Sequence, residues 1–246
     1  DILSKLSPKM RIMEIMKSIE KISNQKASLD EIRGLVSEEW SLLDQEIEKQ
    51  LSSDIELINN VSQYIVSSGG KRIRPLMVLL SAKACGASDI DRIVKAAAMI
   101  EFIHTATLLH DDVVDNSDSR RGIKTAHQSF GNESTILVGD FLYSRAFQIM
   151  VQINHMGIME IMSDATNTIA EGEVLQLINS GNPKTNKEQY LEVIYRKTGK
   201  LFEAAMVAGG LLSNQSQTVI HNLQIFGKEL GMAYQIVDDV LDYNSS

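Results

Sequence analysis

Two groups of aspartates with the same internal spacing are the residues of this sequence best suited to chemistry. The first group is Asp111, Asp112 and Asp115, and the second is Asp238, Asp239 and Asp242. On a helix, positions i and i+4 lie one turn apart on one face, so the outer carboxylates of each group can hold a hard cation. Mg²⁺ is typically bound by one or two carboxylates together with phosphate oxygens of a substrate. The pattern therefore predicts Mg²⁺ sites on two sides of one diphosphate.

The residues before each aspartate cluster are mostly apolar, which predicts that both helices are buried. A solvated acidic face is the alternative interpretation of such a cluster. A buried carboxylate does not stay ionised without compensation, because desolvation of an isolated charge costs about several kcal/mol or more. A bound cation supplies that compensation. Zinc is not favoured, since His104 and His110 belong to neither a HExxH nor a CxxC pattern.

Basic residues occur in short groups that suit one or two diphosphates. Lys71 and Arg74 follow a Gly-Gly turn and precede a helix, whereas Arg120 and Arg121 follow the first aspartate cluster. Cations beside a helix N-terminus favour phosphate binding, although a loop with solvated charges is the alternative. His104 lies two helical turns before the first cluster and could reach the same ligand. A lone histidine on an apolar helix is more often a core residue.

Composition indicates a protein of the soluble globular class. The chain has 246 residues, of which 43% are hydrophobic, and a formal net charge of −8. An acidic chain with only short basic groups is not expected to bind nucleic acid. No run approaches the roughly 18 apolar residues of a membrane span, and no secretion signal is apparent, so we expect a cytoplasmic protein without a transmembrane segment. The single cysteine, Cys85, fits a reducing compartment.

The fold class predicted from apolar periodicity is all-α, in a single domain that spans residues 1–246. Ser28 and Glu31 form a predicted capping box at the start of the first assigned helix. Later helices are expected to start near Pro75 and to cover about 89–115, 134–155, 158–180, 186–212 and 216–243. The helix at 89–115 is apolar on most sides and is predicted to lie at the centre of the bundle. Residues 1–27 form an N-terminal extension of unassigned role.

Six ordered motifs carry a resemblance to a known family. They are GGKRIRP (69–75), LLHDDVVDxSDxRRG (108–122), VGDFLYxRAF (138–147), EGEVLQL (171–177), KTGKLFEAA (197–205) and YQIVDDVLDY (234–243). Together they resemble the motif set of trans-isoprenyl diphosphate synthases, over about Ser28 to Tyr243. Within that family the chain is most similar to bacterial octaprenyl diphosphate synthases, which make the quinone side chain. The resemblance implies a helical bundle of the isoprenoid synthase type with a central substrate cavity.

The resemblance also implies roles for individual residues. The Mg²⁺ ligands would be Asp111 and Asp115, and Asp238 and Asp242, with Asp112, Asp239 and Lys197 also in the catalytic set. Isopentenyl diphosphate would be held by Lys71, Arg74, His104 and Arg121. The allylic diphosphate, expected to be farnesyl diphosphate, would contact Arg120, Lys197, Thr198 and Gln235. The implied reaction is ionisation of the allylic substrate, condensation and loss of a proton, in a cytoplasmic homodimer. Its product would be a precursor of membrane lipids in ubiquinone biosynthesis.

Chain length is expected to depend on the residues before the first aspartate. Synthases of shorter products usually have an aromatic residue four or five positions before it, and this chain has Thr107 and Ala106 there. The methyl group of Ala106 is predicted to let a long tail pass. Larger side chains would then form the tunnel floor, although plain core packing is an equal alternative for them. The candidates are Phe102, Phe147 and Met150.

Three alternatives stay open. One is a synthase of the shorter geranylgeranyl or farnesyl type. A terpene cyclase is disfavoured because its second metal motif is normally of Asn-Ser/Thr-Glu type and it lacks GGKRIRP. A non-catalytic partner subunit is disfavoured because both aspartate clusters are intact. Family members usually continue past the second cluster into further helices, whereas this sequence ends four residues after Asp242, so we expect a C-terminal segment to be missing or disordered.

Overall fold

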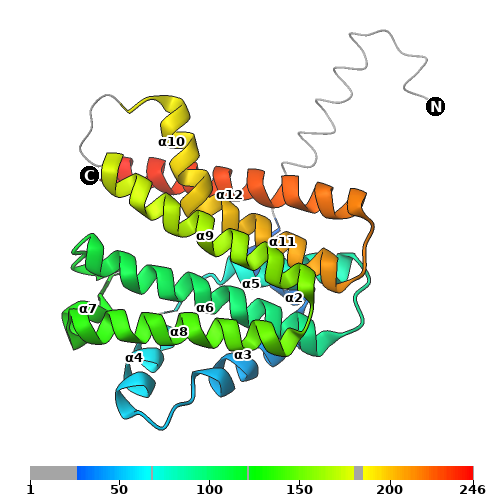
Figure 1. The fold of residues 1–246 in the computed structure, drawn as a ribbon, viewed down its shortest axis with the longest axis horizontal. Helices are drawn as coiled ribbons and strands as arrows, with labels where there is room; N and C mark the ends of the chain where they lie inside the picture. Colours follow the sequence, from blue (N-terminus) through cyan, green and yellow to red (C-terminus); the bar gives the residue numbers. More distant parts are fainter. Residues whose placement is uncertain (1–26, 68, 121, 180–184, 246) are drawn as a thin grey trace. The chain divides into compact units, whose positions relative to one another are not determined.

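The structure is a computed structural model that describes residues 27–67, 69–120, 122–179 and 185–245 (Figure 1). The chain divides into a short N-terminal unit that ends at Ser37 and a larger unit, Glu38–Ser246. Residues 1–26 of the N-terminal extension and Arg121 lie outside the described residues, so the predicted role of Arg121 stays a prediction. The same holds for the single-domain assignment.

The short N-terminal unit contains α2 (Leu29–Gly34), which begins at the capping box predicted from the sequence. The Glu31 N–H donates to Ser28 Oγ at 3.2 Å, and the Ser28 N–H donates to Glu31 Oε2 at 2.6 Å. Two backbone N–H groups that have no partner inside the helix are thereby satisfied. The capping box is confirmed.

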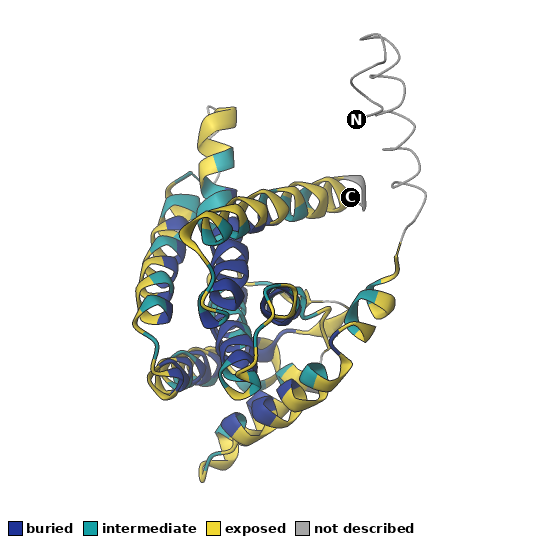
Figure 2. Cartoon of the chain, turned by 90° about the vertical axis from the view of Figure 1, so that its right-hand side faces the viewer, coloured by how far each residue is buried: buried dark blue, intermediate teal, exposed yellow. Residues whose placement is uncertain are grey.

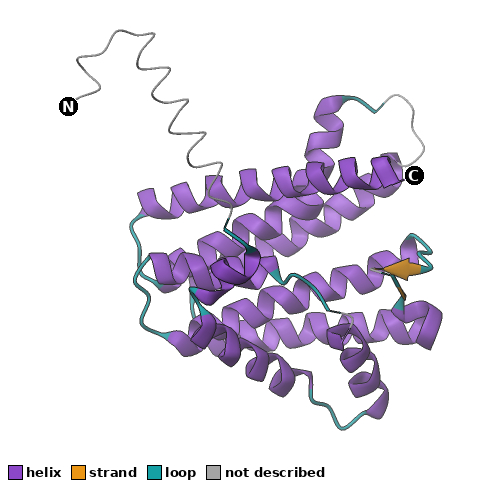
Figure 3. Ribbon diagram, turned by 180° about the vertical axis from the view of Figure 1, so that it is seen from behind, coloured by secondary structure: helices purple, strands orange, loops and turns teal. Residues whose placement is uncertain are grey.

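The larger unit is built almost entirely of helices (Figure 3), which confirms the all-α class. Its first half contains α3 (Ser37–Leu51), α4 (Glu56–Ser67), α5 (Ile73–Ala84), α6 (Ile90–Val114), α7 (Ala126–Phe130) and α8 (Asn132–Ile153). Its second half contains α9 (Met156–Asn179), α10 (Lys187–Ile194), the π-helical turn η2 (Tyr195–Gly199), α11 (Lys200–Leu212) and α12 (Gln217–Ser245). A two-stranded antiparallel hairpin, β1 (Ser119–Arg120) and β2 (Ile123–Lys124), follows α6.

Helix α6 is the central helix of the larger unit, as predicted from its apolar sides. It packs against α8, α5 and α11, and α11 packs in turn against α12 and α9. By length and composition α6 could cross a membrane, but 61% of its most apolar window is buried inside the protein. Such burial is typical of a core helix, and Figure 2 shows buried residues concentrated on the inner helices.

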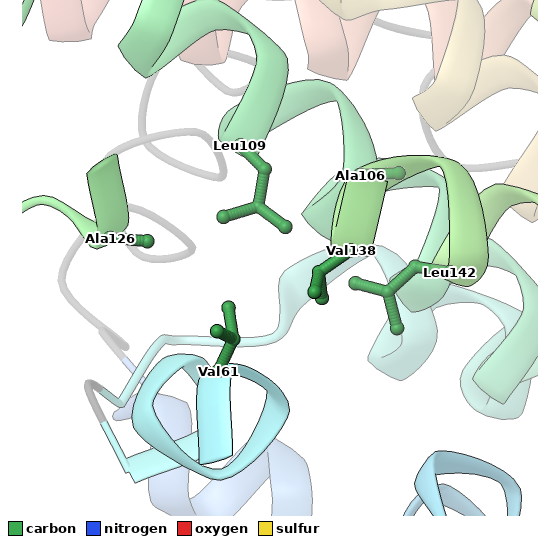
Figure 4. Packing of buried hydrophobic residues seen from close by; sticks show 6 residues of the cluster. All are labelled: Val61, Ala106, Leu109, Ala126, Val138 and Leu142. Atoms are coloured by element: carbon green, nitrogen blue, oxygen red, sulfur yellow. The ribbon is translucent and has the colours of Figure 1, made fainter. Parts of the chain in front are cut away.

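A cluster of buried apolar side chains joins α6 to its neighbours on one side (Figure 4). Its members come from α4, α6, α7 and α8, and they are Val61, Ala106, Leu109, Ala126, Val138 and Leu142. Each is at most 4% exposed, so this packing removes nearly all of their apolar surface from water. The cluster holds the C-terminal half of α6, which carries the first aspartate cluster, against α8.

Helices α10, η2 and α11 follow one another without a break. In η2 the backbone takes up one extra residue, as π-helical turns do, and it contains Lys197 and Thr198. Close helix crossings surround this turn. A Cβ atom added at Gly172 of α9 would lie 2.7 Å from Arg196 Cβ, and one added at Gly231 of α12 would lie 2.8 Å from Gly199 Cα. The turn is therefore fixed between α9 and α12.

Candidate active site

The first aspartate cluster lies at the C-terminal end of α6. Asp115 is the C-cap residue and is exposed, Asp111 is largely buried, and Asp112 is buried. Asp112 Oδ1 accepts a hydrogen bond from Arg120 Nε at 2.9 Å, and Arg120 Nη2 lies 2.8 Å from the same oxygen. The sequence assigned these two residues to separate roles, and the structure brings them together as an ion pair.

Lys197 bridges the first aspartate cluster to α9. Its Nζ lies 3.1 Å from Asp111 Oδ2 and 2.8 Å from Glu173 Oε2. Burial raises the pKa of Asp111, an effect that Lys197 opposes and Asp115 reinforces. Burial alone would lower the pKa of Lys197, but Asp111 and Glu173 hold it above its ordinary value. The ammonium is therefore firmly charged next to the predicted metal ligands.

Glu173 is a site residue that the sequence analysis did not identify. It is half-buried on α9, and burial raises its pKa, while the hydrogen bond from Lys197 has the opposite effect. The sequence could have indicated Glu173, because it lies in the apolar motif EGEVLQL and a glutamate is costly to bury without a partner. Its partner lies on η2, 24 residues later, and only the fold reveals it.

The second aspartate cluster lies near the end of α12. Asp238 and Asp242 are exposed, whereas Asp239 is half-buried. Gln235, one turn earlier, accepts a hydrogen bond from Thr198 Oγ1 at 2.7 Å and donates one to Asp239 Oδ1 at 2.7 Å. Thr198 and Gln235, which the resemblance placed together at the allylic diphosphate, are thus in direct contact.

The carboxylates suit a metal that takes part of its coordination from its substrate. Among the described residues, no group of three or more acidic, histidine or cysteine side chains is gathered closely enough to enclose an ion. Mg²⁺ needs no such enclosure, since one or two carboxylates and several phosphate or water oxygens commonly complete its shell. Asp111 and Asp115, one helical turn apart, offer oxygen donors of this kind.

Two of the residues predicted to bind isopentenyl diphosphate are in contact. Arg74 Nη1 and His104 Nε2 are 3.0 Å apart, and the Arg74 guanidinium also lies 4.6 Å from the centre of the Phe202 ring. Both residues line a cleft of about 100 Å³, together with Lys71 and Tyr234. Burial lowers the pKa of Arg74 to about 10, which leaves it charged at neutral pH.

Arg74 also has unused hydrogen-bonding capacity. Its Nε is buried and, within the part of the chain that the structure describes, has no hydrogen-bond partner. A buried donor without a partner costs about 1–3 kcal/mol, and an anion in the cleft would satisfy it. The fourth predicted binding residue, Arg121, lies outside the described residues.

The loop before α5 is held in an unusual conformation. Arg72 has φ 45° and ψ 48°, the left-handed region that a residue with a side chain seldom adopts. Its guanidinium forms an ion pair with Asp44 of α3. The ion pair anchors the loop between Lys71 and Arg74, and no sequence pattern indicated this arrangement.

A larger cleft, of about 420 Å³, adjoins the first aspartate cluster. It is bounded by α6, α8 and α9, and its lining includes Thr107, Asp111, Tyr143, Ile169 and Glu173. Asp111 and Glu173 make one part of it polar, while Tyr143 and Ile169 contribute apolar surface. A ligand with a charged head and an apolar tail fits such a lining.

The four residues predicted to control chain length lie in different places. Ala106 is fully buried in the apolar cluster of Figure 4, and it is the next residue, Thr107, that lines the larger cleft. Phe102 lines the smaller cleft with Arg74. The Phe147 ring lies 5.7 Å from the Tyr143 ring of the larger cleft, and Met150 is buried further along α8. Their roles stay predictions.

Comparison with known proteins agrees with these motifs. Residues 55–246 match the family model for polyprenyl synthetase. Octaprenyl diphosphate synthase of Escherichia coli is 50% identical over 218 residues, which are 89% of this chain and 67% of that protein. The Haemophilus influenzae octaprenyl diphosphate synthase is 48% identical, over 89% of this chain and 66% of that protein.

A solved structure shows the same fold. The crystal structure of a polyprenyl synthase from Caulobacter crescentus, complexed with calcium and isoprenyl diphosphate, superposes with a TM-score of 0.87 at 42% identity. The match covers 89% of this chain and 67% of that one, so the chain spans about two thirds of the length of its relatives. The family model, the identities and the fold agree, and the chain belongs to the polyprenyl synthetase family, whose members are prenyltransferases.

Proposed function

We propose that this chain is the prenyltransferase part of a long-chain polyprenyl diphosphate synthase that depends on Mg²⁺. It condenses farnesyl or another allylic diphosphate with successive isopentenyl diphosphates, and its product is octaprenyl diphosphate. The observation that carries the proposal is the pair of clefts beside α6. Asp111 lines the larger, partly apolar one, while Lys71, Arg74 and His104 line the smaller one.

The larger cleft is assigned to the allylic substrate. Asp111 and Asp115 on α6, with Asp238 and Asp242 on α12, would hold Mg²⁺, which when bound supplies Lewis-acid stabilisation of the departing diphosphate. Lys197 places a fixed positive charge beside Asp111 and favours charge build-up on the leaving oxygen. The tail lies along Thr107 and Ile169, whose apolar atoms exclude water from the reacting carbon.

The smaller cleft is assigned to isopentenyl diphosphate. Lys71 and Arg74 bind its diphosphate, and His104 adds a donor beside Arg74. Departure of the allylic diphosphate with its bonding electron pair leaves a carbocation, which the double bond of isopentenyl diphosphate attacks. A proton is then lost to the released diphosphate, so no side chain has to act as nucleophile.

Incubation of the protein with farnesyl diphosphate, labelled isopentenyl diphosphate and Mg²⁺ tests the proposal. We expect label in an octaprenyl product and no incorporation when the metal is removed by a chelator. A geranylgeranyl product would support the shorter-chain alternative, and absence of any incorporation would reject the proposed activity for this chain. The homodimer, the cytoplasmic location and the supply of ubiquinone side chains stay predictions.

Substitution of Arg74 separates the two substrate assignments. Arg74→Ala should raise the KM for isopentenyl diphosphate by roughly 10- to 100-fold, because a charge-assisted contact contributes about 1.5–3 kcal/mol. The KM for the allylic substrate should change far less. Steady-state kinetics with each substrate varied in turn measures both constants.

Lys83→Ala is the matched control for Arg74→Ala. Lys83 is a cation on the same helix, and it pairs with Glu39 at 3.2 Å near the other end of α5. Its replacement should leave both KM values unchanged. Equal increases in the two KM values of Arg74→Ala would show that the assignment of the smaller cleft is wrong.

A further inference from the structure

The middle carboxylate of the second aspartate cluster is already engaged by the protein. Asp239 Oδ2 accepts a hydrogen bond from the Tyr190 hydroxyl at 2.5 Å, and Asp239 Oδ1 accepts one from Gln235 Nε2 at 2.7 Å. Gln235 also accepts from Thr198 Oγ1. Three hydrogen bonds thus run from Tyr190 on α10, through Asp239 and Gln235 on α12, to Thr198 on η2.

The hydrogen-bonded chain fixes the rotation of α12 about its axis. Gln235 and Asp239 are four residues apart and therefore share one face, which is turned toward α10 and η2. Asp238 and Asp242 are also four residues apart, and the face that they share is offset by about 60° from that of Gln235 and Asp239. Holding Asp239 in place therefore determines the direction in which Asp238 and Asp242 point.

Two close helix crossings also hold α12 at positions before the second cluster. Gly227 and Gly231 bring α12 close to α11 and η2, since Cβ atoms there would lie 2.8 Å from Glu203 Cα and from Gly199 Cα respectively. Asp238 is about two turns beyond Gly231. The hydrogen bonds that involve Tyr190 and Thr198 hold α12 against α10 and η2 beyond these crossings, at the level of the aspartates.

We propose that Tyr190 is a positioning residue for the second aspartate cluster, and that Asp239 is its anchor and not a metal ligand. The proposal rests on the proposed function, because it assigns Mg²⁺ binding to Asp238 and Asp242. Groups that orient metal ligands through hydrogen bonds typically change metal affinity or activity by about 10- to 100-fold when they are removed. The aromatic hydroxyl of Tyr190 is such a group, one helix away from the ligands.

Tyr190→Phe removes the hydroxyl and keeps the ring. We expect the Mg²⁺ concentration for half-maximal activity to rise about tenfold, with little change in the KM for isopentenyl diphosphate. A second readout needs no turnover. Calorimetric binding of farnesyl thiodiphosphate, an unreactive allylic analogue, should weaken about tenfold in the presence of Mg²⁺ and should be unchanged in its absence.

The matched control is Tyr195→Phe. Tyr195 undergoes the same chemical change, and its hydroxyl also donates to a carboxylate, Glu203, at 2.9 Å. Glu203 is buried away from the second cluster, so this variant should lower the melting temperature without moving the Mg²⁺ constant. A purely structural role of Tyr190 would make the two variants behave alike, and that result would overturn the proposal.

A second pair of variants tests the anchor role of Asp239. Both changes remove one charge. Asp239→Asn keeps an oxygen that can accept from Tyr190 but not the second acceptor used by Gln235, whereas Asp238→Asn alters a predicted ligand. We expect Asp238→Asn to weaken Mg²⁺-dependent analogue binding at least tenfold more than Asp239→Asn does. Equal losses would show that Asp239 binds metal and that the proposal is wrong. Failure of the unaltered protein to bind the analogue with Mg²⁺ would instead reject the proposed function, and the present proposal with it.

Discussion

Replacement of Asp111 by Ala should reduce kcat/KM by about 10³-fold or more, because metal-assisted departure of diphosphate contributes several kcal/mol and each 1.36 kcal/mol is a factor of ten. The fold should survive. Burial raises the pKa of the Asp111 carboxyl, although Lys197 opposes this effect, so loss of the carboxyl also relieves a desolvation cost. Its removal also leaves Lys197 paired with Glu173. Circular dichroism melting and incorporation of labelled isopentenyl diphosphate measure the two properties separately.

Asp140→Ala is the control for the loss of Asp111. Asp140 lines the same larger cleft and is an exposed carboxylate on α8, 3.4 Å from His110 Nε2. It lies outside both aspartate clusters, so its loss should reduce kcat/KM far less than the loss of Asp111 does. Wild-type rates from Asp111→Ala would remove the metal hypothesis for the first cluster.

The second large effect is expected in product length. Thr107→Phe should shift the product toward farnesyl or geranylgeranyl diphosphate. Thr107 lies one turn before Asp111 on the wall of the larger cleft, so a tail whose head is held at Asp111 must pass it. Each added unit buries apolar surface worth about 25 cal/mol per Å², and elongation continues until the path is blocked. Chromatography of the labelled products gives their chain length.

Ala106→Phe is the comparison that decides the path of the tail. Ala106 is fully buried among Val61, Val138 and Leu142, so a ring there overpacks the core at a cost of about 1–3 kcal/mol. We expect a lower melting temperature from this variant. Shortened products from Ala106→Phe together with unchanged products from Thr107→Phe would place the tail beside Ala106, as the sequence analysis predicted.

The fold was largely predictable because apolar periodicity and capping residues are local signals. The central helix was expected at about 89–115 and is Ile90–Val114, and the helix expected near Pro75 is Ile73–Ala84. The helix expected at 186–212 is instead interrupted by η2. No local pattern marks that turn, because the close approaches of Gly172 and Gly231 that surround it involve residues far apart in the sequence.

Site residues that belong to a recognisable motif could be predicted from the sequence. Site residues that meet a partner only in the folded protein could not. Arg74 and His104 were assigned to one ligand and are 3.0 Å apart. Glu173 and Tyr190 were missed, because each lies on a helix without an aspartate cluster and meets its partner only after α9, α10 and α12 have packed. The left-handed conformation of Arg72 was also beyond prediction, and so was its ion pair with Asp44 of α3, which no local pattern marks.

The π-helical turn η2 makes the continuous helical segment α10–η2–α11 sensitive to changes in its length. On one side of η2, Tyr190 is oriented toward Asp239, and on the other side Phe202 lies under Arg74. One residue corresponds to about 100° of rotation in a helix. The turn takes up its extra residue locally, so the helices on its two sides keep these two orientations. Deleting one residue of the turn would leave a regular α-helix and would displace Lys197 and Thr198, which the turn directs toward Asp111 and Gln235. Among natural variants of this protein, substitutions should therefore be tolerated here far more readily than single-residue deletions.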